Sequence, residues 1–197
     1  MKPIFKDRHD AAMKLAEKLV PYKGKNGIVL AVPRGGVPIG YVIAKELGLP
    51  LEIILSKKIG HPYNPEFAIG SVSLHGALID DSVMDVDMDY IHREAERIFK
   101  ELKSRFKLFM GDRKPATLKN KIVIVVDDGV ATGSTIKATV HSIRKDNPKE
   151  IIIAVPVSPP QTAYELRNIC DDFVCLSTPQ EFYGVGQFYD DFSQVSD

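Results

Sequence analysis

The sequence predicts an α/β fold in which a doubly wound parallel sheet of about five strands carries flanking helices. Apolar, β-branched runs at 122–126 and 151–157 are typical of parallel strands that are buried on both faces. Stretches with the apolar spacing of helices alternate with such runs, which favours βα units over an all-β or all-α arrangement. In a sheet of this kind, ligands bind beyond the carboxyl ends of the strands.

Composition limits the class of protein. The chain has 197 residues, so we expect one domain spanning 1–197. Lys plus Arg (26) equals Asp plus Glu (26), so no overall charge would gather nucleic acid or an anionic membrane. Cys170 and Cys175 match no common zinc or redox spacing, and we expect idle thiols in a reducing compartment. There is no signal-peptide core and no apolar run of about 18 residues, which predicts a cytoplasmic protein.

The first half of the chain predicts helices and short strands in alternation. Asp7 is a suitable N-cap for the first helix, Pro38 suits the first turn of the second, and Gly48 suits its C-cap. The turn residues His75 and Gly76 favour a hairpin bend. The predicted elements are a helix at 7–20, strands at 28–32 and 51–55, a helix at 37–47, a hairpin of 67–74 with 77–79, and a helix at 87–109.

The second half repeats the strand and helix pattern. It predicts strands at 122–126 and 151–157, a helix that starts near Ser134, and a helix at 161–168.

The segment 122–135, IVIVVDDGVATGST, carries the strongest chemical signal. Backbone N–H groups at the start of a helix can converge on a phosphate, and Gly133 lets the backbone come close to it. Asp127 and Asp128 follow the strand directly, and adjacent carboxylates are suited to accept hydrogen bonds from a vicinal diol. A phosphate cradle beside a diol-binding acidic pair predicts a site for a ribose 5-phosphate.

Other interpretations of this segment fit the sequence less well. The GxxxxGK[ST] spacing of a Walker loop is absent. A single aspartate at the end of a strand is often only a cap or a turn former. A phosphatase of the HAD type would need paired aspartates in a DxD spacing early in the chain, and the early sequence has none.

VVDDGVATGST resembles the phosphoribosyl pyrophosphate signature of type I phosphoribosyltransferases, and the resemblance covers most of the chain from Ile28 onward. It implies the type I fold, with Asp127 and Asp128 on the ribose hydroxyls. It also implies that the following loop binds the donor, chiefly its 5-phosphate, through Gly129, Val130, Ala131, Thr132, Gly133, Ser134 and Thr135.

The family also has a pyrophosphate loop after its first sheet strand. Arg34, Gly35 and Gly36 occupy that position, where Arg34 supplies a cation and the glycines free the backbone amides. Type I enzymes often place a strained or cis peptide in this loop, and Arg34–Gly35 is the expected position.

Lys57 and Lys58 are expected to end the second strand at its carboxyl edge. The resemblance implies that one of them reaches the pyrophosphate or the 5-phosphate pocket. It further implies a flexible lid at about 60–80, with Lys58, His61 and Glu66 as its functional groups.

The C-terminal segment, at about 176–197, resembles the hood that grips the base in the hypoxanthine-guanine branch. The resemblance implies that Phe182 stacks on a base, that Tyr183 and Val185 offer backbone contacts, and that Asp190 or Asp191 approaches the metal or pyrophosphate. A satellite core that merely packs the aromatic residues is the alternative.

The sequence leaves the acceptor open. Enzymes for 6-oxopurines carry an acid in the phosphate loop, and this chain has Ala131 there. The loop therefore resembles the adenine and uracil types, whereas the tail resembles the 6-oxopurine type.

The resemblance implies a Mg²⁺-dependent enzyme that transfers ribose 5-phosphate from phosphoribosyl pyrophosphate to a small nitrogenous acceptor such as a nucleobase. Asp127 and Asp128 would hold the metal indirectly. Family members commonly pair, so a homodimer is expected, with no nucleic-acid or membrane partner. The alternative is a non-catalytic sensor of phosphoribosyl pyrophosphate, although such regulators usually show a basic face or an added DNA-binding domain.

Overall fold

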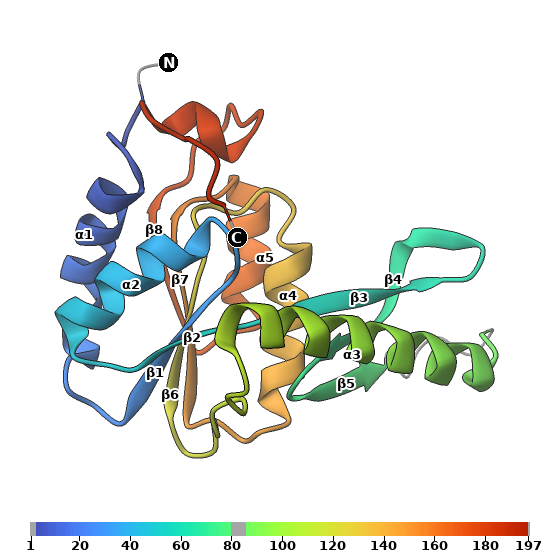
Figure 1. The fold of residues 1–197 in the computed structure, drawn as a ribbon. Coiled ribbons are helices and arrows are strands. Elements are labelled where there is room, and N and C mark those ends of the chain that lie inside the picture. The colour runs from blue at the N-terminus through green and yellow to red at the C-terminus, as the bar shows by residue number, and fades with distance from the viewer. Residues whose placement is uncertain (1–2, 80–85, 197) are drawn as a thin grey trace.

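The computed structural model describes residues 3–79 and 86–196. Its centre is a parallel sheet of five strands in the order β2-β1-β6-β7-β8. Figure 1 shows this sheet between two layers of helices, which is the doubly wound α/β architecture that the sequence predicts. The strands are β1 (Gly27–Ala31), β2 (Leu51–Ile53), β6 (Ile122–Val126), β7 (Glu150–Val157) and β8 (Asp172–Ser177).

Alternate residues of the central strands feed two separate cores. On one face, Ile124 and Ile152 pack under α1 (Arg8–Leu19) and α2 (Gly36–Leu47). On the other face, Val123 and Val125 pack under α4 (Ser134–Arg144) and α5 (Pro160–Arg167). Burial on both faces explains why these strands are continuous apolar runs.

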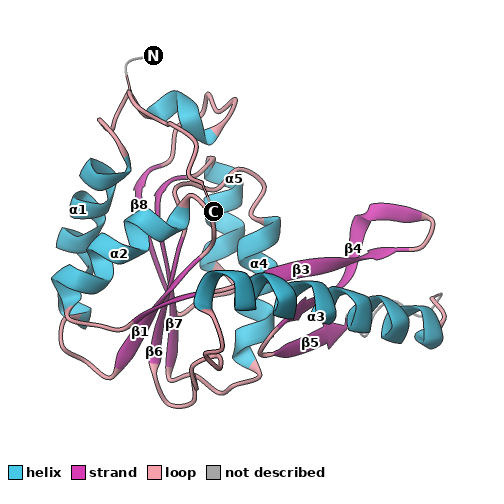
Figure 2. Ribbon diagram, viewed as in Figure 1, coloured by secondary structure: helices cyan, strands magenta, loops and turns pink. Residues whose placement is uncertain are grey.

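A second, antiparallel sheet of three strands stands beside the first (Figure 2). It consists of β3 (Ser56–His61), β4 (Asn64–Ser73) and β5 (Gly76–Ile79). The long helix α3 (Met88–Met110) covers it with one apolar stripe, in which Ile91, Ile98, Leu102 and Phe106 are buried.

The C-terminal segment pairs with the N-terminal one. Phe5 and Tyr189 form a parallel bridge, and the Asp190 and Asp191 amides donate to Phe5 O and Lys6 O at 2.9 and 2.8 Å. Phe188, in a short 3-10 helix (Val185–Phe188), is fully buried against the α1 and α2 core. Figure 1 shows this red segment and the blue N-terminal segment over the same end of the sheet.

Most predicted elements are confirmed to within a few residues. Asp7 caps α1 by accepting from the Asp10 amide at 2.8 Å, and Gly48 ends α2 with φ +66°. The hairpin bend at His75 and Gly76 is also confirmed, since β4 ends at Ser73 and β5 begins at Gly76. Residue 80, the end of the expected lid, lies outside the described residues.

Two expectations were wrong. Lys57 and Lys58 do not end the second strand at the carboxyl edge of the parallel sheet, because β2 stops at Ile53 and both lysines lie inside β3. The cis peptide in the glycine loop joins Pro33 to Arg34, not Arg34 to Gly35. The sequence prediction also did not include β8, whose residues are only half buried at the sheet edge.

Candidate active site

The two aspartates lie where strand β6 ends. Asp127 turns inward, and its Oδ1 accepts the backbone N–H of Asp128 at 2.8 Å. Burial, and then the neighbouring charge of Asp128, raise the pKa of Asp127 well above its ordinary value. Burial also raises the pKa of Asp128, while the Arg8 guanidinium opposes that shift. The pair is therefore a desolvated acidic site rather than a solvated turn.

The glycine loop packs directly on these aspartates. A Cβ on Gly35 would lie 1.9 Å from Asp128 Oδ2, and a Cβ on Gly36 would lie 2.7 Å from Val126 O. Only glycine fits at either position, because both neighbours are held by the end of the sheet. The loop predicted to bind pyrophosphate is thus in contact with the pair predicted to bind ribose, and Arg34 is exposed at its tip.

The loop 129–133 is held by hydrogen bonds to neighbouring segments and is exposed near the start of α4. The Val130 amide donates to Val157 O at 2.9 Å, and the Thr162 hydroxyl donates to Ala131 O at 2.7 Å. Gly133 adopts φ +74° just before α4 begins at Ser134. This geometry leaves four side chains exposed around the start of the helix, namely Ala131, Thr132, Ser134 and Thr135. A helix start with open amides and hydroxyls is suited to an anion.

Neither lysine of β3 is bonded to the acidic pair. The Lys57 ammonium lies 3.0 Å from a Glu101 carboxylate oxygen on α3. The Lys58 ammonium lies 2.9 Å from Glu66 Oε2, so it joins β3 to β4 within the expected lid. His61 lies at the tip of this hairpin beside the Tyr63 ring, 5.9 Å between centroids.

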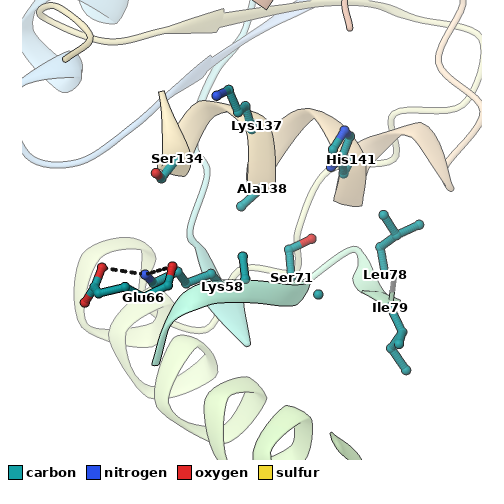
Figure 3. A pocket seen from close by; sticks show the side chains of 11 residues that line it. Lys58, Glu66, Ser71, Leu78, Ile79, Ser134, Lys137, Ala138 and His141 are labelled. Atoms are coloured by element: carbon teal, nitrogen blue, oxygen red, sulfur yellow. Dashed lines mark hydrogen bonds and ion pairs between the residues drawn. The ribbon is translucent and has the colours of Figure 1, made fainter. Parts of the chain in front are cut away.

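The two lysines instead line cavities on either side of the start of α4. A cavity of about 550 Å³ between α4 and the second sheet is lined by Lys58, Glu66 and Ser134 (Figure 3). Its wall includes Ser71, a buried hydroxyl with no hydrogen-bond partner in the described structure. A smaller cavity of about 210 Å³ is lined by Lys57 and Thr135. The expected lid and the start of α4 therefore share the larger cavity, whereas the smaller one lies between the beginning of β3 and α3.

The C-terminal segment that was expected to form a hood lies against the signature loop, and its aromatic residues differ in burial. A Cβ on Gly129 would lie 2.5 Å from Val185 Cγ1, so the hood contacts the loop closely. Phe182 is half buried, with its ring 5.2 Å from that of Phe188, whereas Tyr183 is 90% exposed. Asp190 is exposed and does not line the cavity at Asp128.

The structure adds two residues that the sequence analysis did not single out, Arg8 and Tyr189. Arg8 Nε and NH2 lie 2.9 and 2.8 Å from Asp128 Oδ2. The Tyr189 hydroxyl donates to the backbone oxygen of Asp128 at 2.6 Å. Arg8 lies 120 residues from Asp128 in the sequence, and no local pattern marks such a contact.

A third cavity, of about 320 Å³, opens between Arg8, Arg34 and Asp128. The tail residues Phe192, Gln194 and Val195 form its outer wall. Two guanidinium groups beside one carboxylate make this space suited to an anion that carries hydroxyl groups nearby.

Comparison with known proteins identifies the family. A family model described as the phosphoribosyl transferase domain matches residues 4–193. The chain belongs to this family. The match spans both predicted phosphate loops and the C-terminal hood, so the type I resemblance holds over almost the whole chain.

Individual phosphoribosyl transferase relatives agree. A Mycobacterium tuberculosis protein named "putative phosphoribosyl transferase" is 37% identical over 98% of this chain, which covers 45% of that protein. The chain thus spans less than half the length of this curated relative. The crystal structure of TT1426 from Thermus thermophilus is 36% identical, with a TM-score of 0.90 over 98% of this chain and 93% of that one. A hypoxanthine phosphoribosyltransferase from Staphylococcus aureus, 13% identical with a TM-score of 0.51, covers 92% of this chain and 79% of that one and shares the fold.

No helix within 3–79 and 86–196 has the length and apolar character needed to cross a membrane.

Proposed function

We propose that this domain transfers ribose 5-phosphate from phosphoribosyl pyrophosphate to a small nitrogenous acceptor, most simply a nucleobase, and releases pyrophosphate. One observation carries the proposal: in the partly buried pair of Asp127 and Asp128, Asp128 lies in contact with the glycine loop at Gly35. In the donor, the hydroxyls and the pyrophosphate are attached to the same ribose ring. The subsites that bind them must therefore lie next to each other. The family match supports the same reaction class.

In this proposal each segment holds one part of the donor. Asp127 and Asp128 accept hydrogen bonds from the ribose hydroxyls, and the amides of 131–135 hold the 5-phosphate. Arg34 and the amides of its loop hold the pyrophosphate. The acceptor nitrogen forms a bond to C1 of the ribose as the bond from C1 to the pyrophosphate oxygen breaks, and the electron pair of that bond leaves with pyrophosphate. The proton that the acceptor nitrogen loses is released to solvent. Arg34, Lys57 and Lys58 would counter the charge that develops on the leaving group.

Mg²⁺ would neutralise pyrophosphate charge in this reaction. The described residues hold no cluster of three side chains that could bind a metal ion. Mg²⁺ commonly takes most of its ligands from substrate phosphates and water and only one or two from carboxylates. The paired Asp127 and Asp128 fit that supporting role, either directly or through water, while the exposed Asp190 would have to move to join them.

The acceptor would bind under the hood, beside Val185 and Phe182. The half-buried Phe182 would need to expose one ring face to stack on a base, and Tyr183 and Val185 would offer backbone groups to its edge. We take the partners to be the donor and a small-molecule acceptor, with a homodimer as the working unit.

The decisive experiment follows pyrophosphate release from phosphoribosyl pyrophosphate with Mg²⁺ and a panel of nucleobases and amines. We expect release that depends on one acceptor and disappears in the double variant Asp127→Asn, Asp128→Asn, whose fold is checked by circular dichroism. Full activity in that variant would exclude the proposed roles of the pair. Donor binding without release for any acceptor would instead indicate a phosphoribosyl pyrophosphate sensor.

A further inference from the structure

Helix α3 lines a cavity that also borders both predicted phosphate-binding loops. This cavity, of about 210 Å³, is lined by Pro33 at the start of the glycine loop and by Thr135 at the start of α4. Lys57 of β3 and two residues of α3, Glu101 and Arg105, complete its polar lining. It is smaller than the cavities of about 300–1,000 Å³ that hold whole small-molecule ligands, so it suits one group of a ligand.

The charges that line this cavity favour an anion. Lys57 and Arg105 contribute two positive charges, and Glu101 contributes one negative charge. Glu101 is paired with Lys57, whose ammonium donates to both carboxylate oxygens at 3.1 and 3.0 Å. The pair cancels its own charge, and the charge of Arg105 remains.

The Arg105 guanidinium is not neutralised by a carboxylate. In the part of the chain that the structure describes, Arg105 takes part in no ion pair. Its guanidinium carbon lies 5.9 Å from the centre of the Phe109 ring, one turn further along α3. A ring face attracts the cation without accepting a conventional hydrogen bond, so the planar fork of N–H donors stays available to an oxyanion.

Ser56 fixes the position of this cavity relative to the phosphate loop. Its hydroxyl lies 2.7 Å from the Thr139 hydroxyl on α4 and donates to Thr135 O at 3.3 Å. The first residue of β3 is thus bonded to the first turns of α4, and Lys57 is the next residue along the chain. The cavity therefore belongs to the phosphate-binding end of the site and not to the tip of the hairpin.

We propose that Arg105 binds a phosphate group of the donor in this cavity, together with Lys57, so that α3 supplies a cation to the transferase site. Glu101 holds the Lys57 ammonium toward α3, and a phosphate in the cavity competes with Glu101 for it. The inference rests on the proposed function for the identity of the ligand. The donor carries two suitable groups, the pyrophosphate and the 5-phosphate, and the cavity borders the loops predicted for both.

Binding can be tested without turnover. Titration calorimetry measures the affinity of the protein for inorganic pyrophosphate and for ribose 5-phosphate, each with Mg²⁺. For Arg105→Met we expect the affinity for one of these ligands to fall by about tenfold, the usual effect of losing a charge-assisted hydrogen bond. The ligand that is affected identifies the group that Arg105 binds. Arg105→Lys should recover part of the loss, since lysine keeps the charge and loses the fork.

The control is Arg93→Met, which removes an exposed arginine from the same helix. It should change neither affinity. Unchanged affinities in Arg105→Met, or equal losses for both ligands, would overturn the proposal, because a single phosphate contact must distinguish the two. Thermal unfolding of each variant checks that the fold is intact.

Glu101→Gln should have the opposite effect. It removes the carboxylate that competes for Lys57, so the affinity for the same ligand should rise by about twofold to fivefold, the range expected for an exposed ion pair. Glu96→Gln, which removes an exposed carboxylate paired with Lys100 on the same helix, is the matched control. An affinity that falls or stays the same in Glu101→Gln would overturn the proposed competition.

The transferase assay separates this inference from the proposed function. If the wild type transfers ribose 5-phosphate while Arg105→Met binds both ligands normally, only the role of Arg105 is refuted. If the wild type transfers to no acceptor, but Arg105→Met still loses affinity for one ligand, the proposed function is refuted and the phosphate site stands. A wild type that binds neither ligand refutes both.

Discussion

Asp127 and Asp128 are carboxylates that the fold partly removes from water. Their pKa values are raised by burial, so the folded protein binds protons that the unfolded chain has already released. In that pH window, between the ordinary aspartate value and the raised one, stability falls as pH rises. The acidic pair therefore costs stability at neutral pH, as is common for sites arranged for function.

Asp127→Asn should stabilise the protein at pH 8, by about 1 kcal/mol. The asparagine oxygen can still accept the Asp128 amide, while the desolvated charge beside Asp128 is gone. Urea unfolding at several pH values measures the difference, which should shrink as the pH falls toward 4 because the wild-type carboxyl then becomes neutral.

Asp128→Asn is the matched control and should stabilise the protein less than Asp127→Asn does at pH 8. It also removes a raised-pKa carboxylate, but it takes the counter-charge away from the partly buried Arg8. Equal effects of the two substitutions would contradict a stabilising contribution from the Arg8 and Asp128 ion pair.

At the scale of single residues, the sequence predicted those parts of the site whose residues are close together in the chain. The pair at 127–128 and the loop to Thr135 are contiguous and follow an apolar run, so their position at a strand end could be predicted. The Arg8 contact could not, because it depends on how α1 packs on the sheet.

At the scale of elements, the β3–β4 hairpin belongs to a second sheet. The sequence predicted a strand to Leu55 because Ile54 and Leu55 continue the apolar run. Both residues are buried, but Ile54 belongs to the core under α4, while Leu55 belongs to the core under α3. Because the apolar run continues from one core into the next, the sequence pattern does not reveal that β2 ends and β3 begins there. Lys57 and Lys58 are therefore carried on the hairpin and not on the parallel sheet.

Lys58→Met should raise the donor KM by about tenfold without lowering stability by more than about 0.5 kcal/mol. The ion pair that it removes is weak, because Glu66 is 92% exposed, whereas the ammonium faces the cavity shared with Ser134. Donor titration and thermal unfolding together measure the two effects. Lys100→Met, an exposed cation on α3, is the control, and an unchanged donor KM in Lys58→Met would exclude a role in donor binding.

At the scale of the whole molecule, the hood is part of a main core. The sequence suggested either a base-binding hood or a satellite core of aromatic residues, and the buried aromatic residues of this segment belong to a main core and not to a separate one. Phe188 and Tyr189 are buried with α1, α2 and the sheet, whereas Tyr183 is exposed. Which aromatic side chain of this segment is buried depends on how the segment packs against the rest of the fold, so the local sequence does not predict it.

Phe188→Ala should lower the free energy of unfolding by about 3–5 kcal/mol, as expected for a fully buried phenylalanine. Tyr183→Ala, at a 90% exposed position, should change it by less than about 0.5 kcal/mol. Chemical denaturation of both variants measures this contrast. Comparable small losses would mean that the hood is loosely attached and could open as a unit.

The contact between Arg8 and Asp128 also has a consequence for the order in which the protein folds. It joins residues that are 120 positions apart, and the bridge between Phe5 and Tyr189 spans still more of the chain. Contacts with such large sequence separation carry a high loop-closure entropy and form slowly. During synthesis, α1 would emerge from the ribosome long before β6, and Tyr189, whose hydroxyl bonds the backbone of Asp128, would emerge after β6. The contacts around Asp128 therefore cannot be complete until the chain through residue 189 has been made.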